Sequence, residues 1–324
     1  MSCDGCMSRI VFRDLNGIVL LDKPLGLSSN QALQQARRLF RAAKGGHTGA
    51  LDPQASGMLP LCFGEATKVA GLLRGASKRY LAQVQLGATT TTGDADGEVL
   101  QRRAVPGISD EQLQAVLASQ VGRIRQQPPI YSALKVDGEP AYRRVRRGEE
   151  VEVAAREVEI FRIELLQRRA DWLEIEVDCG SGTYIRSLAV DIGEALGCGA
   201  HICALRREWV DPFQNAPMLS LDQLEQAAAD SDQALLTHLL PLEQGLARFQ
   251  MIHLDADQSL AIRQGRRVVI SDQSAAETAL ALDEAAIPVA LVHVASGGVI
   301  TIQRGLNLGP APAAEGMTSS GNGA

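Results

Sequence analysis

The feature that most constrains the fold of this chain is the alternation of strand-like segments with amphipathic helical ones. Residues 78–87 (KRYLAQVQLG) alternate polar and apolar side chains, which is the period of a half-buried strand. Residues 28–46 repeat apolar side chains at helical spacing instead, and Ser28 and Gln31 have the spacing of a capping box. Gly45 and Gly46 are predicted to end that helix.

The same pattern continues as far as about residue 245. Strands are predicted within residues 17–23, 157–169, 172–180 and 200–210, and helices within 109–122 and 182–197. Strands separated by helices, with several hairpin-like pairs, predict a mixed-sheet domain of the α/β or α+β class.

A second, smaller module is predicted after a boundary near residue 245. Residues 250–308 contain a short helix, Gly265, a strand, and then two strands around Ser296, Gly297 and Gly298. Residues 310–324 are rich in Ala, Gly, Pro and Ser and are predicted to be disordered, as are residues 1–9.

Charge is unevenly distributed over the 324 residues, whose net charge is −6. Residues 1–80 hold 11 basic and 5 acidic side chains, whereas residues 208–324 hold 5 and 14. A basic front suits one surface that faces a polyanion, although basic faces can also be merely solvated. With no apolar run near ~20 residues, no secretory signal and six scattered cysteines, we expect a cytoplasmic protein without a membrane segment.

Cofactor and metal motifs are missing from the sequence. It has no P-loop, no dinucleotide fingerprint, no GxSxG elbow and no HExxH. Cys3 and Cys6 form one CxxC pair without a second pair, so a zinc ribbon is not expected. We therefore expect no cofactor and no metal site.

Carboxylate chemistry is what remains, and it centres on residues 46–53 (GHTGALDP). Asp52 lies in a run of small residues just after a basic helix, where it can face a substrate or simply form an Asx-turn. Arg186, between apolar Ile185 and Leu188, is expected to be half-buried and to need a carboxylate partner. Ordinary structural roles are equally open to four nearby residues. His47 and Lys23 can be loop or turn residues, and Tyr80 and Tyr184 can lie at the edge of the core.

A third group of residues is basic. Residues 124–152 combine Pro, Gly, two tyrosines and an arginine cluster, which predicts a projecting loop with a short helix. The predicted helix before Gly45 adds basic side chains that lie largely off its apolar stripe. The arginines of these two segments are Arg143, Arg144, Arg146, Arg147, Arg37, Arg38 and Arg41.

Taken together, the sequence resembles the bacterial TruB family, the tRNA pseudouridine synthases that modify the uridine at position 55 in the T-loop. The resemblance covers residues 10–245, with a weaker similarity up to about 308 to the family's PUA-like module. The segments that carry it occur in the family's order: LLDKPLGLSSNQAL, GHTGALDPQASGMLPLCFGEATK, KRYLAQVQLG, TGDADGE, IYSALKVDGEPAY and GTYIRSLAVDIGEALGCGAHICALRR.

This resemblance implies an α+β pseudouridine-synthase fold with a mixed, largely antiparallel sheet. It implies that Asp52 is the catalytic aspartate, that Arg186 pairs with it, and that residues 124–152 form an RNA-gripping thumb. It also implies a tRNA substrate bound through its T-arm, a folding role on tRNA, and a monomer without an obligatory protein partner. The further residues implied to contact the substrate or to support the site are His47, Tyr80, Tyr184, Leu205 and Lys23.

Two other functions stay open at this stage. One is a non-catalytic RNA-binding or tRNA-folding protein on the same scaffold. The other is a glycoside hydrolase, which needs two acidic residues ~5–10 Å apart. Asp94 and Asp96 are the candidates for the second acid, but their polar loop is predicted to lie far from Asp52.

Overall fold

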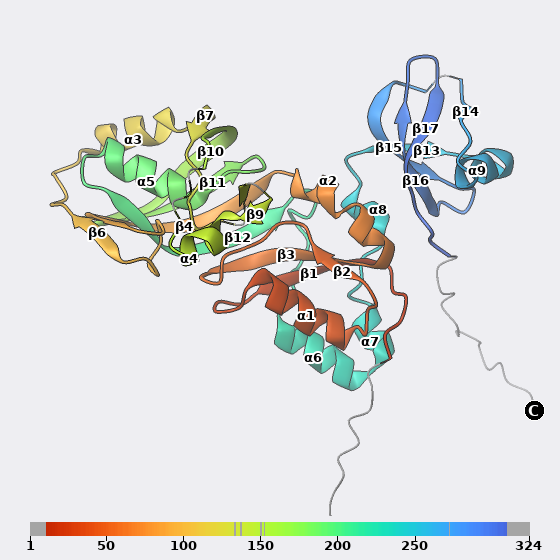
Figure 1. Ribbon diagram of the computed structural model, residues 1–324, viewed down its shortest axis with the longest axis horizontal. Coiled ribbons are helices and arrows are strands. Elements are labelled where there is room, and N and C mark those ends of the chain that lie inside the picture. Colours follow the sequence, from red (N-terminus) through yellow and green to blue (C-terminus); the bar gives the residue numbers. More distant parts are fainter. Residues whose placement is uncertain are drawn as a thin grey trace, which may run out of the picture. The chain divides into compact units, whose positions relative to one another are not determined.

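The computed structural model describes residues 11–309 except positions 133, 137, 150, 152 and 272. The chain forms two compact units, one ending at Leu240 and the other beginning at Pro241 (Figure 1). The predicted disordered termini, residues 1–9 and 310–324, lie outside the described residues. Within the described residues no helix is long and apolar enough to cross a membrane.

The first unit is built on an eight-stranded sheet of order β1-β3-β12-β4-β11-β10-β7, with β2 also paired to β3. Every pairing is antiparallel except that of β12 with β3, which confirms the predicted mixed, largely antiparallel sheet. Its strands are β1 (Gly17–Lys23), β2 (Gly45–His47), β3 (Ala55–Phe63), β4 (Lys78–Leu86), β7 (Gly122–Gln126), β10 (Arg156–Arg169), β11 (Trp172–Cys179) and β12 (Ala200–Val210).

One face of β4, β11 and β10 is covered by two helices, α3 (Asp110–Ser119) and α5 (Ile185–Ala195) (Figure 1). Buried and half-buried residues alternate without a break along β4 and β11, as the sequence pattern predicts. Leu188 and Ile192 of α5 are fully buried against the sheet. This packing fixes the first turn of α5, which carries Arg186.

The strand β3 was not predicted from the sequence. Eight of its nine residues are buried, because α1 (Ser29–Leu39) and α6 (Leu221–Asp230) pack on one face while the other face is also covered. A strand buried on both faces loses the alternating pattern. Gly57 (φ 99°) meets β12 there so closely that an added Cβ would lie 2.1 Å from the Arg207 carbonyl oxygen.

Helix α1 begins as predicted, with a capping box between Ser28 and Gln31, but its predicted end is wrong. It stops at Leu39, and Arg41 adopts a left-handed conformation (φ 51°) that reverses the chain. The Arg37 side chain donates hydrogen bonds to the carbonyls of Ala42 and Ala43 in this reversal, which accounts for the early stop. The two glycines predicted to end the helix belong to β2.

Among the residues that the structure describes, four helices begin with a capping box, and in all four the residue at the third position is glutamine: α1, α3, α6 and α9 (Ala256–Arg263). Acidic residues occupy the first turn of α3, α6 and α9 but not of α1. The other short helices of the first unit are η1 (Gly64–Lys68), α2 (Ala70–Arg74) and α7 (Asp232–Leu236).

Two small hairpins branch from the main sheet. One joins β5 (Ala88–Thr90) to β6 (Val99–Arg102), and the loop between them carries Asp94. The other, β8 (Lys135–Val136) with β9 (Glu139–Pro140), leads into α4 (Ala141–Arg146) before the chain re-enters the sheet at β10. This second excursion is the loop and short helix predicted for residues 124–152, and we call it the thumb.

The second unit is β-rich, as predicted. It begins with α8 (Leu242–Gly245), and α9 packs on a five-stranded sheet of order β13-β15-β16-β17-β14. The predicted helix, Gly265 and strand correspond to α9 and β14, and the predicted strand pair to β16 and β17. The strands are β13 (Gln250–His253), β14 (Val268–Val269), β15 (Ala276–Leu282), β16 (Pro288–Val294) and β17 (Val299–Gly305).

Candidate active site

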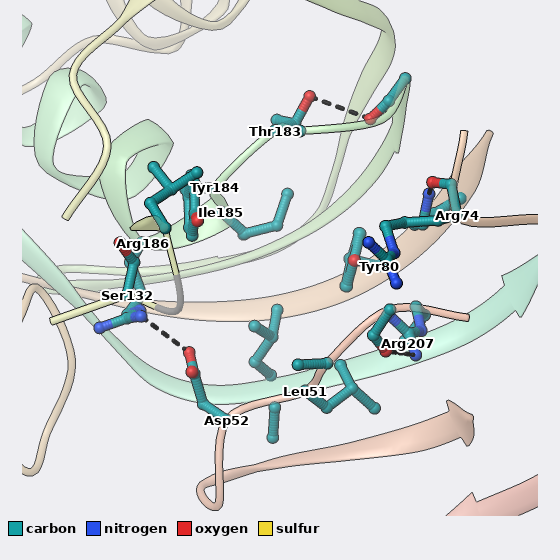
Figure 2. A pocket seen from close by; sticks show the side chains of 18 of the residues that line it. Leu51, Asp52, Arg74, Tyr80, Ser132, Thr183, Tyr184, Ile185, Arg186 and Arg207 are labelled. Carbon is teal, nitrogen blue, oxygen red and sulfur yellow. Dashed lines mark hydrogen bonds and ion pairs between the residues drawn. The ribbon is translucent and has the colours of Figure 1, made fainter. Parts of the chain in front are cut away.

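A cavity of about 480 Å³ opens over the middle of the large sheet, between the loop that joins β2 to β3 and the start of α5 (Figure 2). Six of the seven residues expected to contact substrate or support the site line it, and Lys23 does not. The six are His47, Asp52, Tyr80, Tyr184, Arg186 and Leu205.

The loop that carries Asp52 is fixed to α1. Ser29 Oγ accepts a hydrogen bond from the Leu51 amide (2.7 Å) and donates one to the Leu51 carbonyl (3.0 Å). The Gly26 amide donates to the Pro53 carbonyl, and the Ala55 amide to the Asp52 carbonyl. With its neighbours held on both sides, Asp52 points into the cavity from a rigid backbone.

Arg186 makes the expected ion pair with Asp52, with Nη2 3.0 Å from Oδ2. Only 6% of the Arg186 side chain is exposed, because it lies in the first turn of α5 against the sheet. Its two terminal nitrogens also donate to the carbonyls of Thr92 and Tyr131, both at 3.0 Å. The guanidinium is therefore held by several groups at once, and the carboxylate of Asp52 is aimed by it (Figure 2).

The ionisation of Asp52 is governed mainly by burial. Burial in the cavity raises the pKa of this carboxyl above its usual value, and the Arg186 charge opposes that rise without cancelling it. The cost of taking the carboxyl partly out of water outweighs the gain from one cation that other groups already share.

Tyr80 of β4 lies directly opposite Arg207 of β12. Tyr80 is 8% exposed, and burial raises its pKa while the nearby charge of Arg207 opposes the rise. Arg207 is itself fully buried: Nε donates to the Met58 carbonyl (2.7 Å) and Nη2 to the Gly49 carbonyl (3.1 Å). Buried Arg207 thus connects its own strand, β12, to β3 through Met58 and to the Asp52 loop through Gly49.

Arg207 was not among the site residues predicted from the sequence. Two register shifts in the pairing of β12 with β4 change which of its side chains face the core. An alternating pattern cannot reveal such a change. The one available signal was the paired arginine in "ALRRE", where one of the two must face inward.

Lys23 lies at the end of β1 and is fully buried. Its Nζ donates to the carbonyls of Pro24 and Leu27, both at 2.7 Å, and burial lowers its pKa to about 8. It holds the turn whose Gly26 bonds Pro53, so it supports the Asp52 loop from behind.

His47 ends β2 at the rim of the cavity. Burial and the nearby charges of Arg74 and Arg207 lower its pKa, so the ring is biased towards its neutral form. Its Nδ1 is buried and has no hydrogen-bond partner among the described residues. Within the part of the chain that the structure describes, no group of three potential metal ligands gathers, here or elsewhere.

Comparisons with known proteins show to which family this chain belongs. Residues 37–185 match the model of the TruB family pseudouridylate synthase N-terminal domain, and residues 186–247 match the tRNA pseudouridylate synthase B C-terminal domain. The chain is 56% identical over 304 residues to the tRNA pseudouridine synthase B of Xylella fastidiosa (93% of this chain, 99% of the relative). The chain belongs to the TruB family of pseudouridylate synthases.

Other relatives and solved structures agree. The tRNA pseudouridine synthase B of Xanthomonas axonopodis pv. citri is 59% identical over 260 residues, covering 80% of this chain and 84% of the relative. A chain in an H/ACA RNP bound to a substrate RNA containing 2′-deoxyuridine has a TM-score of 0.70 and 21% identity, covering 90% of this chain and 85% of that chain. At that identity the likeness shows the fold, which is the expected pseudouridine-synthase fold.

The expected position of Asp94 is wrong for this TruB-family chain. Its carboxylate lies 3.4 Å from Nη1 of Arg186, so Asp52 and Asp94 share one guanidinium. The hairpin of β5 and β6 folds back so that Gly93 packs on the Arg186 side chain, and a bridge to Ile202 fixes the loop. Such a return is invisible in a polar, turn-rich sequence.

The arginines expected to bind RNA on α1 and just after it are only partly available. Arg37 is used in the chain reversal described above, and Arg41 pairs with Asp232. Arg38 is exposed and has no partner among the described residues. Of the three, the described structure leaves Arg38 alone facing solvent without a partner.

The thumb arginines are also paired in part. Arg144 and Arg147 both bind Glu149, and Arg147 also binds Glu139 at 2.6 Å. The charge of Arg143 contributes to lowering the pKa of Glu139. The side chain of Arg146 lies outside the described residues.

Proposed function

We propose that this chain isomerises the uridine at position 55 in the T-loop of tRNA to pseudouridine, with Asp52 as its catalytic group. The observation that carries the proposal is the Asp52–Arg186 pair, held at 3.0 Å on the floor of a cavity in a TruB-family chain. The tRNA substrate is suggested by the names of its relatives, which are called tRNA pseudouridine synthase B.

The chemistry needs only groups that the cavity offers. The N1–C1′ bond of the uridine breaks and the same uracil is rejoined through C5, with no change of oxidation state and no atom lost. Asp52 either attacks C1′, which becomes electron-poor as the bond breaks, or removes the C2′ proton to give a glycal. Both routes require an ionised Asp52, and neither calls for a cofactor or a metal.

Binding explains the other residues. A base packed in a folded loop must be flipped out at a cost of a few kcal/mol, which stacking on Tyr80 and His47 would offset at ~1–3 kcal/mol per base. Tyr184 and Leu205 would complete the pocket, and Lys23 would keep the Asp52 loop in place. Arg38 and the thumb arginines, Arg143, Arg144, Arg146 and Arg147, would bind phosphates.

We further propose that the enzyme works as a cytoplasmic monomer on the T-arm of tRNA and assists the folding of tRNA. In this scheme residues 10–245 form the catalytic domain, residues 124–152 its thumb, and residues 250–308 a PUA-like domain. No obligatory protein partner is required for the reaction.

A hydrolase fits the site less well. The shared contact of Asp52 and Asp94 with Arg186 places both carboxylates on one cation, whereas glycoside cleavage needs an acid and a second carboxylate on separate sides of the bond. A purely binding role would leave the costly arrangement of Asp52 and Arg186 without a use.

One experiment separates the three functions. The protein is incubated with unmodified tRNA carrying tritium at C5 of uridine, and the RNA is then mapped with carbodiimide. We expect tritium release, an unchanged RNA mass and one modified position in the T-loop. Release of free uracil would indicate a hydrolase, and tight binding without tritium release would indicate a binding protein.

A further inference from the structure

Five cationic side chains line the cavity, and they differ in how many partners they have. The set is Arg74, Lys78, Arg156, Arg186 and Arg207. Among the described residues, Asp52 is the one acidic residue in the same lining. Positive charge therefore exceeds negative charge around the cavity, and the question is which cation remains available to a ligand.

Four of the five are engaged by the protein. Arg186 binds two carboxylates and two carbonyls, and Arg207 binds two carbonyls, as described above. Lys78 donates to the carbonyls of Arg74 (3.0 Å) and Ala76 (2.5 Å). Arg156 donates from Nη2 to the Gly182 carbonyl, and its guanidinium lies 5.0 Å from the centre of the Tyr184 ring.

Arg74 is different. It is the last residue of α2, it is exposed, and its side chain makes no hydrogen bond or ion pair with any residue that the structure describes. Its charge is nevertheless felt inside the cavity, where it helps to lower the pKa of His47. Figure 2 shows Arg74 at the opposite end of the cavity from Asp52.

The backbone beneath Arg74 is rigid although its side chain faces solvent. The Lys78 ammonium binds the Arg74 carbonyl, and Leu73, the preceding residue, is fully buried. The guanidinium is thus presented from a fixed point at the rim of the cavity, which His47 also lines with its buried Nδ1. An anion placed there would neutralise Arg74 and relieve its repulsion of a protonated His47.

We propose that Arg74 binds a phosphodiester of the RNA strand next to the nucleotide held in the cavity. The inference rests on the proposed function, because a nucleotide in the cavity brings its own flanking phosphates to the rim. A guanidinium matches a phosphate with two parallel hydrogen bonds, and an arginine without an internal partner gives up no bond within the protein when it binds one. Arg74 is a binding and positioning residue, distant from the reacting atoms.

The test measures binding of a T-arm hairpin RNA to the full chain, and compares Arg74→Gln with Arg102→Gln. Arg102 is an exposed arginine on β6 without a partner among the described residues, and it lines neither this cavity nor the one beside Thr92. Loss of one phosphate interaction lowers the slope of log affinity against log salt concentration by roughly 0.7–0.9. The loss of affinity between ~50 and ~200 mM salt then becomes about threefold smaller. We expect the lower slope for Arg74→Gln and an unchanged slope for Arg102→Gln.

A second arm identifies the phosphate. Hairpins carrying a neutral methylphosphonate at the linkage 5′ or 3′ of the target uridine are bound to the wild type and to Arg74→Gln. We expect one linkage to weaken wild-type binding several-fold and to have little further effect on the variant, as two partners of one interaction should. Equal weakening of both proteins at both linkages would overturn the proposal, as would an unchanged slope for Arg74→Gln.

Both arms read binding and are independent of turnover. If the wild type binds the hairpin and shows the Arg74 coupling but forms no pseudouridine, the proposed function fails and the phosphate site stands. If pseudouridine forms but the coupling is missing, the phosphate site fails and the function stands. Arg74→Lys should recover part of the slope but not the full affinity, since an ammonium cannot make the paired hydrogen bonds.

Discussion

Arg186 in the cavity and Arg147 in the thumb both bind carboxylates, but their surroundings differ. Arg186 is 6% exposed and binds two carboxylates and two carbonyls, whereas Arg147 is 51% exposed and binds Glu139 and Glu149. An exposed pair contributes ~0–1 kcal/mol, while loss of one partner of a buried pair costs ~3–5 kcal/mol. The buried guanidinium of Arg186 therefore fixes geometry, and the exposed pairs of the thumb can be exchanged for phosphates.

The largest effect that follows from this contrast is for Asp52→Asn. The amide keeps the shape of the side chain but can neither attack C1′ nor accept a proton, so the single-turnover rate should fall by at least ~10³-fold. Affinity for tRNA should change little. Asp171→Asn, an exposed aspartate on the surface, is the matched control; a rate for Asp52→Asn within tenfold of the wild type would end the assignment.

Arg186→Lys comes next. An ammonium cannot reproduce the interactions that the guanidinium makes with Asp52, Asp94 and two carbonyls, and misplacement of a catalytic group by ~1 Å costs ~100-fold in rate. We expect a decrease of about that size in the single-turnover rate with nearly unchanged tRNA affinity. Weaker binding with an intact rate in the bound state would show instead that Arg186 grips RNA.

The pH dependence sharpens the same comparison. Because the pKa of Asp52 is raised above its usual value, the rate should fall about tenfold per pH unit below that raised pKa. Asp94 contributes to the rise, so Asp94→Asn should move the acidic limb to lower pH, whereas Arg186→Gln should move it to higher pH. Single-turnover rates across pH measure the shifts, and movement of both variants in one direction would contradict them.

A smaller effect is expected in the thumb. Replacing Arg143, Arg144, Arg146 and Arg147 with Gln should weaken tRNA binding and reduce the salt slope by roughly 0.7–0.9 for each phosphate that the variant no longer binds. The paired carboxylates compete with phosphate, so Glu139→Gln with Glu149→Gln should tighten binding a few-fold. Unchanged affinity and slope in both sets would mean that the thumb arginines only solvate the surface.

The smallest effect is expected from chelation. Neither route for Asp52 uses a metal ion, so EDTA should leave the turnover of folded tRNA unchanged. The measurement is the initial rate before and after chelation, with the fold of the tRNA checked separately. Restoration of a lowered rate by one specific metal ion would contradict this expectation.

Local patterns predicted the parts of the fold whose burial is one-sided. The β4 and β11 strands, the α3 and α5 helices and the capping box of α1 follow from period and spacing alone. β3 and Arg207 did not, because burial on both faces and shifts of register erase the period. The need of Arg186 for a carboxylate partner was predictable from chemistry, and the family resemblance implied that the partner is Asp52, but the return of Asp94 to the same guanidinium depended on how a distant hairpin folds.

The capping box of α1 bears on how RNA meets this surface. Glutamine in place of glutamate makes the cap uncharged at every pH, and α1 alone among the four boxed helices has no acid in its first turn. A carboxylate there would favour the helix by ~0.3–1 kcal/mol through its dipole. It would also stand beside Ser29, which holds the Asp52 loop, and would repel an approaching polyanion. The start of α1 thus gives up some helix stability and keeps its partial positive charge beside the loop of the proposed RNA site.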